Sequence, residues 1–110
     1  MTGSGTSGPV HPLTEMIAYQ QDAIVSRTIL NKRNGTVTLF AFDANQSLSE
    51  HTAPYDALVY ILEGEADITI AGNTYRVHTG EMITLPANRP HAVAAPVPFK
   101  MLLIMIRSQE

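Results

Sequence analysis

The sequence of 110 residues contains no cysteine and no tryptophan, and only 15% of its residues are charged. Without cysteine the chain has no disulfide, no thiolate nucleophile and no sulfur ligand for a metal ion. Seven Lys and Arg residues against ten Asp and Glu give a formal net charge of −3. Because the basic residues are scattered, we expect no nucleic-acid partner. Any chemistry must come from His, Asp, Glu, Tyr or a bound ion.

Long apolar runs are missing as well. The longest, 57–62 and 101–106, have six residues each, whereas a membrane-spanning helix needs about 20. The first residues also lack the basic start and the apolar stretch of a secretory signal. We therefore expect no membrane association, and a location in the cytoplasm.

The composition also predicts how the chain is divided. Hydrophobic residues make up 45% of its 110 residues, which is too many for a disordered protein and suits one folded domain. Residues 1–10 differ, because they are mostly Gly, Ser, Thr and Pro. We therefore predict a disordered tail over 1–10 and a single domain over 11–110.

From Ala23 onward, short runs rich in β-branched and aromatic residues are separated by turn residues such as Asn34-Gly35 and Gly72-Asn73. No helix is indicated, apart from one short helical turn or an irregular arm within 13–21. The pattern predicts an all-β sandwich or barrel of eight or nine strands. The expected strands cover residues 23–30, 36–42, 47–52, 57–62, 66–71, 74–78, 82–85, 91–95 and 99–107.

Two of these expected strands, 57–62 and 99–106, are apolar on both faces apart from Lys100. A strand with one solvated face alternates between apolar and polar residues, whereas a strand covered on both faces does not. A barrel of this length has too little chain to cover its own outer faces, so we expect the sheet to pack on another molecule. The economical partner is a second copy, and we predict a homodimer.

Two blocks of the sequence, about 45–64 and 80–95, carry His, Pro and Gly at characteristic distances. They resemble the paired motifs of the cupin superfamily (the RmlC-like cupins), written G-x5-H-x-H-x3,4-E-x6-G and G-x5-P-x-G-x2-H-x3-N. The resemblance implies a single cupin domain, a double-stranded β-helix of the jelly-roll type.

The second motif is matched at Gly80, Pro86 and His91, with Asn88 in place of the middle Gly and Ala95 in place of the final Asn. The change at position 88 is mild, because Asn adopts a left-handed turn more readily than other residues with a side chain.

The first motif departs further from the pattern. In metal-bearing cupins, its two histidines and its acidic residue hold the ion together with the histidine of the second motif. The resemblance places His51 and His91 at two of these positions, and Ala53 and Ala57 at the other two. A catalytic zinc ion takes three protein ligands and a structural one four. Two neutral imidazoles would also leave the charge of a divalent ion uncompensated.

A nearby carboxylate would complete a set of two histidines and one carboxylate, which suits Fe(II). The candidates are Asp56, Glu50 and Glu63. Regular alternation from an inward His51 directs Glu50 and Asp56 outward, but a bulge at Pro54 would turn Asp56 inward and make it the third ligand. Glu63 keeps the inward phase but lies at the far end of its strand, where a solvated turn residue is the favoured interpretation.

Inside such a barrel, the expected pocket has apolar walls formed by Val59, Ile61 and Val93, with Tyr55 in phase with the first histidine. Alanine in place of two ligands leaves room for the apolar body of a small molecule. One hypothesis is an enzyme that acts on a small organic molecule with Fe, Mn, Ni, Cu or Zn held by the two histidines. The other is a metal-free module that binds or senses a small molecule in the same pocket. The sequence leaves both open.

Overall fold

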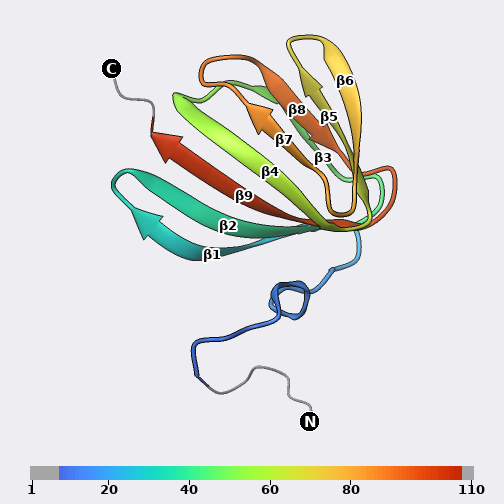
Figure 1. The fold of residues 1–110 in the computed structure, drawn as a ribbon. Helices are drawn as coiled ribbons and strands as arrows, with labels where there is room; N and C mark the ends of the chain where they lie inside the picture. Colours follow the sequence, from blue (N-terminus) through green and yellow to red (C-terminus); the bar gives the residue numbers. More distant parts are fainter. Residues whose placement is uncertain (1–7, 108–110) are drawn as a thin grey trace.

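The computed structural model describes residues 8–107, and this part of the chain forms nine strands (Figure 1) and one short 3-10 turn, η1 (Leu13–Glu15). The all-β prediction is confirmed. Residues 1–7 of the expected tail lie outside the described residues, and 8–10 are exposed. No helix between residues 8 and 107 is long and apolar enough to cross a membrane. The strands are β1 (Ile24–Lys32), β2 (Gly35–Phe42), β3 (Ser47–His51), β4 (Tyr55–Glu63), β5 (Glu65–Ile70), β6 (Asn73–His78), β7 (Met82–Leu85), β8 (His91–Ala94) and β9 (Phe99–Arg107).

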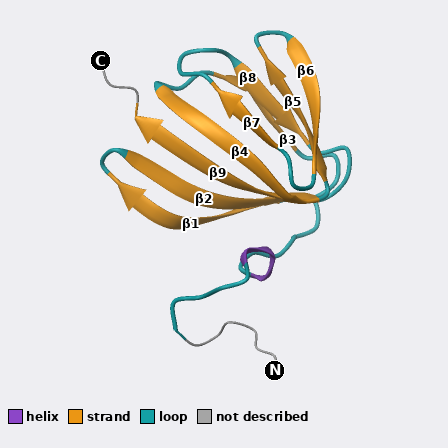
Figure 2. Ribbon diagram, viewed as in Figure 1, coloured by secondary structure: helices purple, strands orange, loops and turns teal. Residues whose placement is uncertain are grey.

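The strands form two antiparallel sheets that face each other (Figure 2). One sheet has the order β1-β2-β9-β4-β7 and the other β3-β8-β5-β6. Neighbours in the sheets are often distant in sequence, since β9 lies between β2 and β4, and β8 lies between β3 and β5. This interleaving is the arrangement of a jelly roll.

The main core lies between the sheets and is centred on Phe42 and Phe99. These two residues are opposite each other in the register of β2 and β9, and their rings stack with centroids 4.5 Å apart. Strict alternation along β2 explains which of its side chains face the main core and which face outward. Phe40 and Phe42 contact this core, whereas Leu39 and Ala41 are buried on the outer face.

The outer face of the five-stranded sheet is partly covered by the N-terminal arm of the same chain. Ile17 is only 7% exposed, and its cluster on this face includes Met16, Tyr19, Leu39, Ala41, Leu62 and Leu102. The ammonium of Lys100 donates a hydrogen bond of 2.6 Å to the carbonyl oxygen of Thr14 and so fixes the arm. The expectation that this chain cannot cover its own outer face was therefore wrong for the part beneath the arm.

A bulge in β4 decides where Glu63 lies. The pairing of β4 with β9 shifts between Ile61 and Glu63, so Glu63 is opposite Lys100 and shares the outer face with it. Its carboxylate accepts a hydrogen bond of 2.6 Å from the Tyr19 hydroxyl. Burial, and secondarily this carboxylate, raise the pKa of Tyr19 well above its usual range. The inward phase expected for Glu63 was wrong. The Glu63 carboxylate instead binds Tyr19 and holds the N-terminal arm against the outer face.

Candidate functional site

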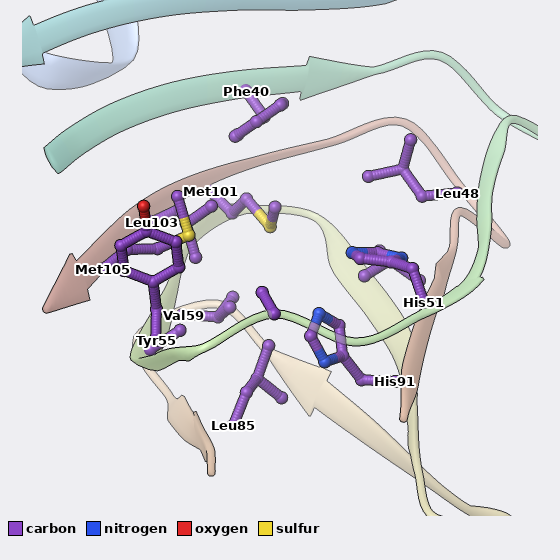
Figure 3. A pocket seen from close by; sticks show the side chains of 13 residues that line it. Phe40, Leu48, His51, Tyr55, Val59, Leu85, His91, Met101, Leu103 and Met105 are labelled. Carbon is purple, nitrogen blue, oxygen red and sulfur yellow. The ribbon is translucent and has the colours of Figure 1, made fainter. Parts of the chain in front are cut away.

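A cavity of about 80 Å³ lies between the two sheets (Figure 3). One water molecule needs roughly 10–15 Å³ on this kind of measure, so the space suits a small organic molecule. Only three of its thirteen lining residues carry a polar group: His51, Tyr55 and His91. The others are Phe40, Leu48, Ala53, Ala57, Val59, Leu85, Val93, Met101, Leu103 and Met105.

The two histidines come from neighbouring strands of the four-stranded sheet. His51 ends β3, His91 begins β8, and the two are opposite each other in the antiparallel register. Their imidazole centroids are 4.3 Å apart and the ring planes meet at 67° (Figure 3). The register shifts between Leu48 and His51, because β3 takes three steps over a stretch where β8 takes two. The bulge brings both imidazoles to the same end of the cavity.

Each imidazole is oriented by the backbone of its own strand region. Nδ1 of His51 lies 2.7 Å from the carbonyl oxygen of Ser49, and Nδ1 of His91 lies 3.3 Å from that of Arg89. A carbonyl oxygen only accepts hydrogen bonds, so we assign the hydrogen to Nδ1 in both rings. In the neutral form, each Nε2 then carries a free lone pair. Burial, together with the neighbouring His51 imidazole, lowers the pKa of His91 although its bond to Arg89 opposes the shift.

The apolar residues expected at the pocket are mostly found there. Val59 and Val93 line the cavity, and so does Tyr55, whose phenol lies across the cavity from the imidazoles (Figure 3). Ile61 does not. It follows Val59 on the inner face of β4 and is fully buried in the core, opposite Met101 in the register.

Asp56 does not reach the imidazoles. It lies on the outer face of β4, and its carboxylate accepts a hydrogen bond of 2.9 Å from the backbone N–H of Ala87. The regular alternation of β4 is kept at this point, since Tyr55 and Ala57 on either side of it line the cavity. The bulge that would have turned Asp56 inward is absent from this part of β4, so the expectation of Asp56 as the third ligand was wrong.

The comparisons with known proteins agree with this architecture. The sequence matches a family profile described as "Cupin domain" over residues 38–106. The chain belongs to the cupin family. A protein of unknown function from Streptococcus pyogenes is 37% identical, with a TM-score of 0.89, and the match covers 98% of this chain and 95% of that one. A cupin from Desulfitobacterium hafniense is 27% identical, with a TM-score of 0.88 and coverage of 96% and 97%.

An uncharacterised protein of Streptomyces coelicolor is 32% identical over 62 residues. This match covers 56% of the cupin chain described here and 59% of the Streptomyces protein.

The donor groups of this cupin do not fit a divalent metal ion. Residues 8–107 contain no group of three or more His, Cys, Asp or Glu side chains that would hold one. Ala53 and Ala57, at the remaining ligand positions of the motif, line the cavity beside His51 and His91 with methyl groups. Two neutral imidazoles fall short of the three or four ligands of zinc sites, and they supply no negative charge.

Sequence reasoning missed half of the cavity wall of this cupin. Phe40, Leu48 and Leu85 contribute to it, as do Met101, Leu103 and Met105 of β9. For β9 the missing signal is its alternation, because Phe99, Met101, Leu103 and Met105 all point inward once the phase is known. A strand that is apolar on both faces hides that phase, so its sequence favours neither face as the inner one.

Proposed function

We propose that this cupin domain binds a small organic molecule in the cavity between its sheets, without a metal ion. The observation that carries the proposal is a largely apolar cavity in which two imidazoles stand 4.3 Å apart and for which residues 8–107 offer no third ligand. Apolar walls with a few placed polar groups are typical of small-molecule sites. The walls supply affinity by excluding water, and the imidazoles orient the polar end of the ligand.

The hypothesis of a metal-dependent enzyme receives no support from the donor set. A Lewis-acid or oxygen-binding role would require an ion at the two imidazoles, and neither Asp56 nor Glu63 lies on the cavity side of β4. We therefore assign this site a binding or sensing role and derive no catalytic step for it.

A screen of small molecules by thermal unfolding, carried out with a chelator present, tests this function. A ligand at a hundredfold excess over its Kd stabilises the protein by about 2.7 kcal/mol. We expect His91→Ala to reduce this stabilisation to about 1.4 kcal/mol, because the loss of one hydrogen bond weakens binding about tenfold. His78→Ala is the matched control, because His78 is exposed on β6 and does not line the cavity. Stabilisation by divalent metals alone, with no response to any organic molecule, would contradict the proposal.

We also propose that two copies associate through the outer face of β4 and β9. Beyond the arm, a groove on this face is lined by Leu58, Ile104 and Ile106 among others, and Ile106 is 59% exposed. Leu58 lies opposite Ile104 in the register, so the apolar side chains form a continuous surface across both strands. A second copy related by a twofold axis would present the same surface in return.

Sedimentation velocity at micromolar concentration checks the dimer. We expect a dimer for the unmodified protein and a folded monomer for Ile106→Glu, because the new carboxylate would stand opposite Asp56 in the register and bury charge at the contact. Tyr75→Glu is the control, since Tyr75 is 49% exposed on the other sheet. A monomer in the unmodified protein would refute the association.

A further inference from the structure

One end of the cavity offers hydrogen-bond acceptors and no donor. The hydrogen on each Nδ1 is already donated to a carbonyl oxygen, of Ser49 for His51 and of Arg89 for His91. Nε2 is the ring nitrogen farther from the backbone, and within residues 8–107 neither Nε2 atom has a hydrogen-bond partner. Each neutral ring therefore directs an unshared lone pair away from its strand.

This arrangement determines which chemical groups the imidazole end accepts. Two lone pairs cannot hydrogen-bond each other, so the rings need a donor from outside the pair. A carboxylate has only acceptor oxygens and would meet the lone pair of a neutral His91 ring unfavourably. Burial lowers the pKa of His91, which favours the neutral form of that ring, and the neutral ring is an acceptor. The hydroxyl of Tyr55 is no substitute donor, since it lies across the cavity from the imidazoles (Figure 3).

We propose that the ligand of this cavity is a compact, largely apolar molecule whose polar head donates to Nε2 of His51 and His91, an amine through two N–H groups and an alcohol or phenol through one O–H shared between the two nitrogens. The inference rests on the proposed function and narrows its ligand to this class. The apolar part of the molecule contacts the wall formed by Val59, Val93 and Leu103 among others.

A divalent cation is the competing occupant, because it also takes up lone pairs. It would need further ligands, and Ala53 and Ala57, at the other two ligand positions of the motif, contribute only methyl groups to the cavity wall. A neutral donor requires no counter-charge in an apolar cavity, so the surroundings favour the organic head group.

Phenol, aniline and toluene are suitable probes because they share one shape and differ in a hydroxyl, an amino or a methyl group. We would titrate the ¹⁵N-labelled protein with each, and with benzoate, in the presence of a chelator, and follow the imidazole nitrogens by NMR. We expect both rings to carry the hydrogen on Nδ1. Phenol and aniline should bind about tenfold tighter than toluene, on the order of one net hydrogen bond, and should shift the Nε2 resonances. Benzoate should not bind.

The variant His51→Leu removes one acceptor at an exposed position and replaces it with an apolar side chain. We expect it to lose most of the preference for phenol over toluene. Retention of the full preference would overturn the inference.

The outcomes separate this inference from the proposed function. Equal affinities for phenol and toluene, or a hydrogen on Nε2 of either ring, would overturn the inference and leave small-molecule binding intact. Absence of binding by all four probes would overturn the proposed function itself. Without chelator, one equivalent of Zn²⁺ that displaces phenol would assign the imidazoles to a metal and overturn both.

Discussion

Replacing Ala53 with His and Ala57 with Glu should turn the cavity into a divalent-metal site. Both side chains already line the cavity with His51 and His91, so the new groups would meet the two imidazoles. The variant would have three imidazoles and one carboxylate, which meets the ligand number of zinc sites and supplies negative charge. We expect about one equivalent of Zn²⁺ to bind with a Kd near micromolar or below, a binding free energy of about −8 kcal/mol. Elemental analysis measures the metal content, and calorimetry measures the Kd.

The matched control for this gain of metal binding is Ala53→Asn with Ala57→Gln. It adds polar side chains at the same two positions but no imidazole and no carboxylate, so we expect a folded protein without stoichiometric metal. The unmodified protein should behave in the same way. Stoichiometric metal in the unmodified protein, or none in the folded His and Glu variant, would show that the two alanines are not what limits metal binding.

Most of the fold follows from local features of the sequence. Turn residues mark the strand ends, and the nine runs expected from them correspond to the nine strands of residues 8–107. Position 88 is a clear case. Asn replaces the Gly of the second motif there, and its φ of 64° shows that the chain keeps the left-handed turn that the motif requires.

What the sequence could not predict depends on interactions between distant segments. The phase of Glu63 follows from a bulge opposite β9, and a bulge has no signature in an apolar run. The cover over Leu39 and Ala41 comes from the N-terminal arm, whose contacts are non-local. The hydrogen on each Nδ1 depends on where a carbonyl oxygen lies two residues earlier, which needs coordinates.

Gly64→Ala should cause a much larger loss of stability than the same change at another glycine in a left-handed conformation. Gly64 joins β4 to β5 with a φ of +77°, and a Cβ there would collide with the carbonyl oxygen of Pro98 and with Phe99. Phe99 cannot move away from the added Cβ, because it is fully buried and stacked on Phe42. The left-handed conformation costs about 1–2 kcal/mol for a residue with a side chain, and overpacking adds about 1–3 kcal/mol.

Gly72→Ala separates these two contributions. Gly72 has a φ of +88°, in the turn between β5 and β6, but no atom lies within 4 Å of the Cβ that alanine would add. Its loss should therefore be only the conformational cost of about 1–2 kcal/mol. Urea unfolding followed by circular dichroism gives both losses, provided the m-values are unchanged. Equal losses for the two variants would mean that the backbone conformation alone demands glycine at position 64. A larger loss at Gly64 would show that the first cupin motif ends in glycine because the β8–β9 connection passes against it.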